Sequence, residues 1–579
     1  MSVIVKTTIE SIKESILSAV GQAVAKGEFP EVPLPPFNIE EPQDRSHGDF
    51  ACNAAMIWAR ALKQAPRNIA EIISENISFV GTYIEKMEIA GPGFMNFYLK
   101  DSYYAAVVSD VLEKGENYGK SDIGNGKKVM VEFVSANPTG PMHIGNARGG
   151  ALGDTLASVL EMAGYEVTRE FYVNDAGNQI QKFGHSLEAR YLQIFDSSIE
   201  FPEDGYHGAD ITERAEEFYK KYGDKYRSVS SEERCKALVD FALPLNIAAL
   251  QEDLSLYRIN YDVWFRESSL YADGTLEKVI GIMKDKGLTY EKDGALWYKN
   301  AEFTAALLKK QGKSDKDIEK LELKDDVLIR ANGNPTYFAA DIAYHYNKFA
   351  IRGFDTVINV WGADHHGHVA RIKGAMDAIG LSGDNLDIVL MQLVRLVRAG
   401  ETVKVSKRTG KSITLKSLLD EVPIDAARFI FNSKEPSTHL EFDLDLAIEQ
   451  SSSNPVYYVQ YAHARICSIL RALKNDGIEP RKCSSEELSL LNAPEERELV
   501  RHLASLTGEI ESSARSYDSA RITRYVYDLA TLFHKFYNAC RVHVEDESLM
   551  QARLNLSVAT ATVIKVVLSM LKIDAPESM

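Results

Sequence analysis

A short apolar run, a breaker-rich loop and a helical pattern, in that order, constrain the fold of this chain more than any other feature. The run is VMVEFV at residues 129–134, the loop is SANPTGP, and HIGNARGGALGDTLASVLEMAGY begins at His143. EVTREFYV, directly after it, has the composition of a second strand. A strand, a helix and a strand in this order form a βαβ unit with parallel strands. The sequence therefore predicts an α/β fold with a Rossmann-like parallel sheet.

The rest of the chain divides on either side of this unit. Residues 1–118 combine helical patterns with two β-type runs separated by Gly91-Pro92-Gly93, which indicates an N-terminal α+β domain. Residues 119–442 are predicted to form the Rossmann-like domain, with TVINVWGADHH and LDIVLMQLVRLV as further strands and a helical insertion at about 192–331. Residues 443–579 show one helical pattern after another, which is typical of a C-terminal all-helical bundle.

Composition and charge exclude several classes of protein. No run approaches the roughly 18 uninterrupted apolar residues of a membrane span, and the N-terminus lacks the pattern of a signal peptide. Five scattered cysteines without a Cys-x-x-Cys pair are typical of reduced thiols, so neither a structural zinc nor another protein-held metal is predicted. A net charge of -17 argues against a protein that coats DNA or RNA. Residues 395–416 are nevertheless strongly basic, which favours local contacts with phosphate.

The loop before the predicted helix has the features of a phosphate-binding site. A helix N-terminus presents unpaired backbone N–H groups and the positive end of the helix dipole. Gly145 has no side chain, so a nucleotide base can lie close to the backbone there. His143 and Asn146 are one turn apart on the same helical face, and both can donate to phosphate oxygens. The alternative is an ordinary connection between a strand and a helix, with an exposed histidine.

A second candidate element is KVSKRTGK, from Lys404 to Lys411. Cations that move into place can stabilise negative charge that develops on a phosphorus centre and on departing pyrophosphate. Ser406 and Gly410 suit a loop that opens and closes. A solvated basic turn is the alternative for this segment when it is considered alone.

Both elements resemble signatures of one class of enzyme. HIGN is similar to the His-Ile-Gly-His signature of class I aminoacyl-tRNA synthetases, and KVSKR is similar to their Lys-Met-Ser-Lys-Ser signature. The longer segment VEFVSANPTGPMHIGNARGGALGD resembles the arginine-specific family. One position departs from the signature, because its last histidine is Asn146 here. Asparagine can donate a neutral hydrogen bond but cannot carry positive charge.

The resemblance implies an activity and a set of residues. In the implied reaction, arginine and ATP, with Mg²⁺, form arginyl-adenylate and pyrophosphate, and arginine is then transferred to the 3′-terminal adenosine of tRNA(Arg). The implied catalytic residues are His143, Asn146, Lys404 and Lys407. The implied ATP-binding residues are Pro138, Gly140, His143, Gly145, Asn146, Ser406 and Lys407.

A receptor for arginine needs carboxylates and a flat surface, because guanidinium is planar, always charged and rich in donors. Tyr337 and Asp341 are four residues apart in a helical pattern and so share one face. The family resemblance assigns arginine binding to both, together with Glu132, Ser135, Asn137, Asp364 and His365. Asn174 and Asp175 are expected to brace the pocket. Metal binding or simple solvation are the alternatives for His365 and His366, but adjacent histidines in a strand would point apart.

The same resemblance implies the roles of the outer domains. The N-terminal domain would contact the tRNA elbow, and the C-terminal bundle would bind the anticodon. A cytoplasmic monomer without membrane or DNA partners is expected. Two other hypotheses are a class I synthetase of different specificity and a non-catalytic tRNA-binding paralogue. The pair of Tyr337 and Asp341 argues against the first, and intact His143, Lys404 and Lys407 argue against the second.

Overall fold

A five-stranded parallel sheet lies at the centre of the molecule. The computed structural model describes residues 2–42, 44–404 and 413–579. The strand order is β12 (Leu386–Met391), β11 (Thr356–Gly362), β5 (Lys128–Glu132), β6 (Glu166–Val173) and β7 (Val263–Arg266), and all neighbours are parallel. The order therefore reverses between β5 and β11, and such a reversal opens a ligand-binding crevice at the carboxyl ends of the strands. The predicted α/β fold with a Rossmann-like sheet is confirmed.

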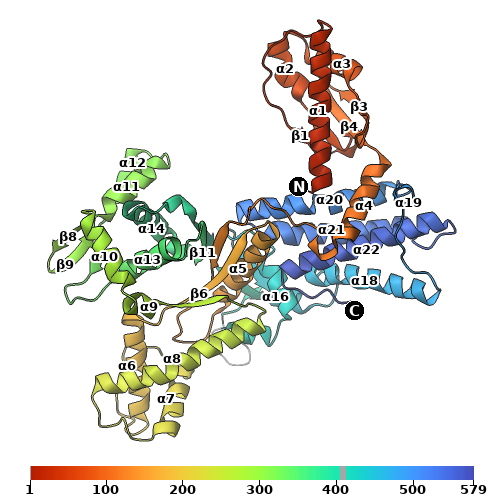
Figure 1. Cartoon of the computed structure of the whole chain (residues 1–579). Helices are drawn as coiled ribbons and strands as arrows, with labels where there is room; N and C mark the ends of the chain where they lie inside the picture. The colour runs from red at the N-terminus through yellow and green to blue at the C-terminus, as the bar shows by residue number, and fades with distance from the viewer. Residues whose placement is uncertain (1, 43, 405–412) are drawn as a thin grey trace.

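Helix α5 (Ile144–Met162) packs closely on this sheet because small residues form much of its buried surface (Figure 1). A Cβ atom placed at Gly153 would lie 2.2 Å from Cγ of Phe133, so the helix approaches β5 to a distance that only glycine permits. Arg148, also buried in α5, donates to the carbonyl oxygens of Gln392 and Glu435 at 2.8 and 3.0 Å. These bonds connect α5 to two segments that lie 244 and 287 residues after Arg148 in the chain, at Gln392 and at Glu435.

Two subdomains lie between β6 and β11. In the first, α6 (Gly177–Gln193), α7 (Ala209–Tyr222) and α8 (Ser231–Leu256) share a core of their own, at the lower left of Figure 1. The second follows β7 and α9 (Glu267–Ala272). It contains α10 (Thr275–Asp285), β8 (Thr289–Lys292), β9 (Ala295–Tyr298), α11 (Asn300–Lys310), α12 (Asp315–Glu319) and β10 (Asp326–Ile329). Its strands form an antiparallel sheet in the order β10-β9-β8.

The prediction of a helical insertion at 192–331 is wrong in one respect. This stretch contains the edge strand of the central sheet, β7, as well as the three antiparallel strands. Each of these four strands has only four residues. Runs of that length are too short to show a strand period against a charged background.

The second half of the central sheet begins with α13 (Tyr337–Tyr346), which continues into a π-helical turn at Asn347–Ile351. Helix α14 (His366–Ile379) connects β11 to β12. The segment LDIVLMQLVRLV, predicted as one strand, forms two: β12 and β13 (Val394–Arg398). Strand β13 belongs to a separate sheet with β14 (Glu401–Thr402) and β15 (Leu440–Asp443). The chain changes sheets at Gln392, whose N–H donates to the carbonyl oxygen of Pro436 at 2.9 Å.

The N-terminal part of the chain extends away from the central sheet, at the top of Figure 1. Its elements are α1 (Val3–Ala25), β1 (Ile39–Glu40), β2 (Phe50–Cys52), α2 (Ala54–Leu62), α3 (Pro66–Asn76), β3 (Ile84–Ala90) and β4 (Phe94–Leu99). The strands form an antiparallel sheet in the order β1-β2-β4-β3. Helix α4 (Asp101–Lys114) then leads to the central sheet. It packs against three C-terminal helices, α19 (Ser485–Leu488), α20 (Pro494–Ser516) and α22 (Glu547–Met570). An ion pair between Arg501 and Asp49, with 2.7 Å between Nε and Oδ1, attaches the N-terminal part to α20.

Helices make up the C-terminal part of the chain. After α15 (Leu415–Leu419), α16 (Ile424–Phe431) and α17 (Leu444–Ile448) come α18 (Pro455–Asn475), α19 (Ser485–Leu488), α20 (Pro494–Ser516), α21 (Ala520–Ala539) and α22 (Glu547–Met570). Among the described helices, α22 is long and apolar enough to cross a membrane by length and composition. Its apolar window is 67% buried among its neighbours, as in the core helix of a bundle.

A tail segment, residues 571–577, follows α22 and returns to the rest of the fold. Arg428 of α16 is fully buried and donates to the carbonyl oxygen of Leu571 at 2.6 Å and to Asp154 Oδ2 of α5 at 2.5 Å. Gln460 of α18 donates to the carbonyl oxygen of Asp574 at 2.9 Å. The tail segment therefore joins the central domain to the helical bundle.

Candidate active site

The chain turns sharply after β5, and this turn forms one wall of the site. Val134 and Ser135 have positive φ angles of 67° and 42°, and this conformation is costly for a β-branched residue such as valine. Ser135 Oγ donates to Glu132 Oε1 at 2.9 Å and accepts from the backbone N–H of Tyr172 at 3.1 Å. The hydroxyl thereby joins the ends of β5 and β6 and supports the strained turn. Asn137 is exposed two residues further on.

The tip of α5 is the second wall. His143 is the N-cap residue and is exposed. The side-chain oxygen of Asn146 accepts from the backbone N–H of His143 at 3.0 Å, so the NH₂ group is the half of this amide that can donate to a ligand. Beyond its own helical turn and its chain neighbours, Gly145 has no atom within 4 Å of the position that a Cβ would take. A 19-residue helix with donors and open space at its N-terminus is suited to an anion.

Helix α8 holds the loop that leads to this tip. Asn246 Nδ2 donates to the carbonyl oxygen of Pro138 at 3.0 Å, and its Oδ1 accepts from Arg214 Nε of α7 at 2.9 Å. At Gly140, a Cβ atom would lie 3.5 Å from a carboxylate oxygen of Asp210, an ordinary contact distance. The first subdomain thus sets the position of the loop between β5 and α5.

The chain that follows the second basic element lies against the tip of α5. Lys404 is exposed, whereas Ser406 and Lys407 lie outside the described residues. Thr414 forms an isolated antiparallel bridge with His143, and the N–H of Leu415 donates to the carbonyl oxygen of Met142 at 2.9 Å. The segment after residue 412 is therefore in direct contact with the tip of α5.

A buried chain of polar groups connects β5, β11 and α13. Lys348 Nζ donates to Glu132 Oε2 at 2.6 Å and to Asn359 Oδ1 at 3.0 Å. The amide NH₂ of Asn359 donates to His345 Nε2 at 2.9 Å, and this assigns the ring proton to Nδ1, 2.8 Å from the carbonyl oxygen of Asp341. Burial and the charge of Lys348 hold the pKa of His345 well below its usual value, so the ring is neutral.

Tyr337 and Asp341 lie on α13 as the helical spacing predicted. The hydroxyl of Tyr337 accepts from the backbone N–H of Gln179 at 3.2 Å, so it contacts the start of α6. Asp341 Oδ2 is 3.0 Å from His368 Nε2 of α14, and about a third of the Asp341 side chain is exposed. The carboxylate is thus oriented by a histidine and still accessible to a cationic ligand.

The strand geometry predicted around His365 and His366 is wrong. Ala363–His365 form a short 3₁₀ helix after β11, and His366 begins α14. The side chains of Asp364 and His365 are 80% and 57% exposed and lie 3.6 Å apart. His368, in the first turn of α14, is the histidine that contacts Asp341. Sequence reasoning missed it because the turn from strand to helix comes earlier than expected.

Glu267 is a further residue of the site that the sequence did not reveal. It follows β7, is 1% exposed, and accepts from the hydroxyl of Tyr271 at 3.2 Å. Burial raises its pKa to about 7, and the charges of Asp341 and Asp175 add to this effect. Its position at the carboxyl end of a parallel strand is the only signal that could have identified it, and β7 itself was not predicted.

The two residues expected to brace the pocket lie beside Glu267. Asn174 donates to Glu267 Oε2 at 2.9 Å in the amide orientation that satisfies both of its ends. The carboxylate of Asp175 accepts from the backbone N–H and the hydroxyl of Ser268, both at 2.8 Å. Asp175 and Glu267 follow the carboxyl ends of β6 and β7, and the charge of Asp341 is close enough to raise the pKa of Glu267, so the three form an acidic group. The tip of α5, which follows β5, provides hydrogen-bond donors.

Comparisons with known families agree with this arrangement. Residues 10–99 match the family described as the arginyl tRNA synthetase N terminal domain. Residues 107–468 match the class I (R) tRNA synthetase catalytic domain, and residues 459–579 match the DALR anticodon binding domain. The parallel sheet, the helix tip and the match over the catalytic part together define the class: the fold is that of a class I aminoacyl-tRNA synthetase.

Longer matches narrow the class to one specificity. The chain is 54% identical over 579 residues to the arginine–tRNA ligase of Caldanaerobacter subterraneus subsp. tengcongensis, with 100% of each chain covered. A solved structure from Campylobacter jejuni, described as an arginyl-tRNA synthetase, is 33% identical with a TM-score of 0.71. That match covers 83% of this chain and 100% of the other. The Thermus thermophilus arginyl-tRNA synthetase has the same fold (TM-score 0.71, 21% identity, coverage 99% and 100%). The chain belongs to the arginyl-tRNA synthetase family.

Proposed function

We propose that this enzyme carries out both steps of arginine–tRNA ligation in the crevice between β5 and β11. In the first step the carboxylate of arginine attacks the α-phosphorus of ATP, an O–P bond forms, and pyrophosphate leaves. In the second step a ribose hydroxyl of the terminal adenosine attacks the activated carbonyl carbon and AMP leaves. The observation that supports this proposal is that a helix tip with N–H donors and an acidic group both lie toward the carboxyl ends of the strands of one sheet.

We propose that the helix tip holds the triphosphate. His143 and Asn146 would donate to phosphate oxygens, and the backbone at Pro138, Gly140 and Gly145 would lie against the nucleotide. Lys404, Ser406 and Lys407 would contact the phosphates when the segment they belong to closes over them. The support is the bridge between Thr414 and His143, which places the residues shortly after that segment at the tip. Positive charge supplied there stabilises the leaving pyrophosphate in the transition state.

Mg²⁺ is proposed to enter with ATP as part of the substrate. This hard cation is usually bound by phosphate oxygens and a small number of carboxylates. His143 and Asn146 at the helix tip provide donors, which suit the phosphates rather than the ion. The ion would neutralise phosphate charge when it is bound.

The substrate arginine is proposed to lie with its side chain against α13. Its carboxylate has to reach the phosphates, so its amino end falls near Glu132, Ser135 and Asn137 at the end of β5. Its guanidinium then extends toward Tyr337 and Asp341, where a planar cation meets an aromatic ring and an accessible carboxylate.

Asp364 and His365 are proposed to contact the substrates at the open rim of the crevice. Both follow β11 and their side chains are largely exposed. Asn174 and Asp175 are proposed to act indirectly, by fixing Glu267 and α9 beside the arginine site.

The outer parts of the chain are proposed to bind tRNA(Arg). Residues 1–118 would contact the elbow, residues 119–442 would hold the catalytic site, and residues 443–579 would bind the anticodon. The family matches at each end support these roles, and α4 and α20 provide a packed connection between the ends. A cytoplasmic monomer that acts without a membrane or DNA partner is proposed as the working form.

The test of this function is the variant Asp341→Asn. A hydrogen bond to a charged group contributes about 1.5–3 kcal/mol, so the KM for arginine should rise about 10- to 150-fold while the KM for ATP changes little. Arginine-dependent ATP–pyrophosphate exchange, measured in the presence of tRNA, gives both values. Asp384→Asn is the control, because Asp384 is exposed and pairs with Lys310 at the surface. An unchanged KM for arginine in Asp341→Asn would remove Asp341 from the binding site.

The same exchange assay, run with a panel of amino acids, tests specificity. Arginine should be the amino acid that supports exchange, and neutral analogues of similar shape should fail because they leave the acidic group unpaired. Exchange with an apolar amino acid would contradict the proposal.

A further inference from the structure

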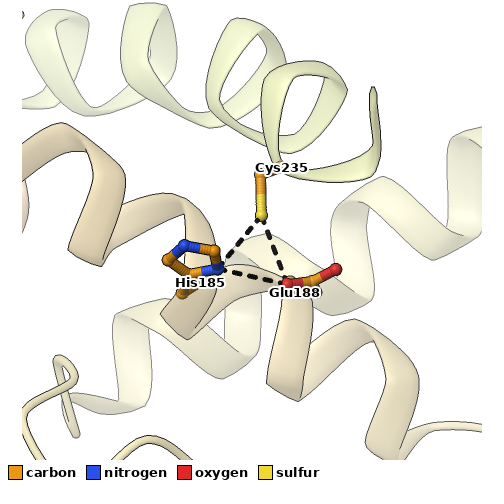
Figure 2. Close-up of side chains that lie close together, drawn as sticks. All are labelled: His185, Glu188 and Cys235. Atoms are coloured by element: carbon orange, nitrogen blue, oxygen red, sulfur yellow. Dashed lines mark hydrogen bonds and ion pairs between the residues drawn. The ribbon is translucent and has the colours of Figure 1, made fainter. Parts of the chain in front are cut away.

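A histidine, a glutamate and a cysteine lie together on the facing sides of α6 and α8, outside the active site (Figure 2). His185 Nδ1 and Glu188 Oε2 are 3.3 Å apart and belong to one turn of α6. Cys235 Sγ of α8 is 3.5 Å from the histidine nitrogen and 3.3 Å from the glutamate oxygen. In the part of the chain that the structure describes, this is the one group of three such side chains with ligand atoms close enough to share a metal ion.

We propose that these three side chains bind a Zn²⁺ ion. Zinc in proteins is bound at about 2.3 Å by sulfur and about 2.0–2.2 Å by nitrogen or oxygen, and tetrahedral geometry then separates the ligand atoms by about 3.3–3.6 Å. The three observed separations lie within or at the edge of this range. Thiolate and imidazole together favour Zn²⁺ over the hard cations Mg²⁺ and Ca²⁺.

The glutamate is already held in the orientation that a metal ligand needs. Arg234 Nε donates to Glu188 Oε1 at 3.0 Å, and Ser231 Oγ donates to Oε2 at 2.8 Å. Contacts of this kind around a metal ligand fix its geometry and increase affinity. Because both partners come from α8, the carboxylate would be oriented by the helix that also supplies the thiol.

The fourth coordination position would be open to solvent. The side chain of His185 is 58% exposed, and the three ligands border two surface cavities, one lined by Lys182 and the other by Lys236. A site with three protein ligands and one open position takes a water molecule as its fourth ligand.

Binding requires the thiol to lose its proton. Burial and the neighbouring carboxylate raise the pKa of Cys235 to about 11, so the metal-free group is a neutral thiol. The Zn–S bond would form as this proton passes to solvent. The same three distances also fit a metal-free group in which the thiol donates a hydrogen bond to Glu188. Titration with Co²⁺ distinguishes a metal site from this hydrogen-bonded group.

An ion at this position would connect two helices that contact the active site at different points. Near its start, α6 contacts Tyr337 through the N–H of Gln179. Helix α8 contacts the nucleotide loop through Asn246 and the carbonyl oxygen of Pro138. Bound zinc would therefore stiffen the support of both walls of the crevice.

The test uses Co²⁺ as a spectroscopic substitute for Zn²⁺. The full chain, stripped with a chelator and kept reduced, is titrated with Co²⁺ and then with Zn²⁺. We expect one equivalent of Co²⁺ to give thiolate-to-cobalt charge transfer and the d–d absorption of a tetrahedral ion, and Zn²⁺ to abolish both. Cys235→Ser should lack the charge-transfer band, and His185→Gln should bind more than about tenfold more weakly, since even outer-shell contacts alter metal affinity about 10- to 100-fold.

The matched control is Cys467→Ser. The sulfur of Cys467 lies 3.8 Å from His463 Nδ1, but no third ligand completes this pair among the described residues. This variant should titrate like the parent, and circular dichroism of each variant checks its fold. Absence of the thiolate-to-cobalt charge-transfer band in the parent protein would by itself overturn the proposal. So would a Cys235→Ser protein with the parent spectrum, or loss of the spectrum in Cys467→Ser.

Discussion

Replacing Lys348 by methionine should destabilise the central domain strongly, because it leaves the carboxylate of Glu132 buried without its ammonium partner. The two side chains are 0% and 8% exposed, and Nζ and Oε2 are 2.6 Å apart. At that distance and an effective dielectric constant of about 20, the attraction is about 6 kcal/mol. Removing one partner of a buried ion pair typically costs about 3–5 kcal/mol, and we expect a loss in this range.

A second substitution tests whether the buried, unpaired charge of Glu132 causes the destabilisation. Adding Glu132→Gln removes the stranded charge, so the double variant should recover about 2 kcal/mol or more relative to the sum of the single variants. The matched surface pair is Lys310 and Asp384, whose Nζ and Oδ2 are 2.9 Å apart with side chains 61% and 64% exposed. Its coupling energy should stay below about 1 kcal/mol.

The appropriate assay is native-state hydrogen exchange of the amides in β5 and β11. Unfolding of a multidomain chain does not follow two states, whereas exchange reports the stability of the strands that carry the pair. Equal coupling energies for the buried and the surface pair would show that burial does not strengthen the contact of Glu132 with Lys348. The reasoning about desolvation would then be refuted.

Two further predictions concern stability. Gly153→Ala should destabilise the protein by about 1–3 kcal/mol because the new methyl group meets Phe133, whereas Gly281→Ala in α10, where the side chain enters open space, should stabilise it by about 0.5–1 kcal/mol. Native-state hydrogen exchange of the amides in α5 and in α10 measures the two changes, and equal signs would contradict the packing argument. Burial raises the pKa of Glu267 to about 7 from an ordinary value of 4.5, so its contribution is fully present below pH 4.5 and is lost as pH rises through 7. The stability of the parent relative to Glu267→Gln should fall by about 3 kcal/mol across that window, and a difference independent of pH would show that Glu267 titrates normally.

The unit from β5 to α5 was predictable because each of its signals is local. A continuous apolar run, a loop with two prolines, and a helix rich in glycine and alanine lie next to each other in the sequence. The pair of Tyr337 and Asp341 was predictable for the same reason, since a spacing of four places two side chains on one helical face.

The partners of these residues were not predictable, because distant segments supply them. Lys348 reaches Glu132 across 216 positions of sequence, and Cys235 reaches Glu188 across 47. No pattern in the local sequence predicts a contact between segments so far apart. Strand β7 was missed since four residues are too few for a period, and Glu267 was missed with it.

The tail segment also has a consequence for the order in which the protein is made. Arg428 sits inside the central domain, yet the carbonyl group of Leu571 that accepts from its guanidinium is synthesised 143 residues later. Until the tail segment has been synthesised, Nε of Arg428 lacks this acceptor. The set of hydrogen bonds around Arg428, which also links α16 to α5, is then incomplete. Chains that end before residue 571 would therefore lack one of the hydrogen bonds that hold α16 in the central domain, even though every strand of the central sheet is present.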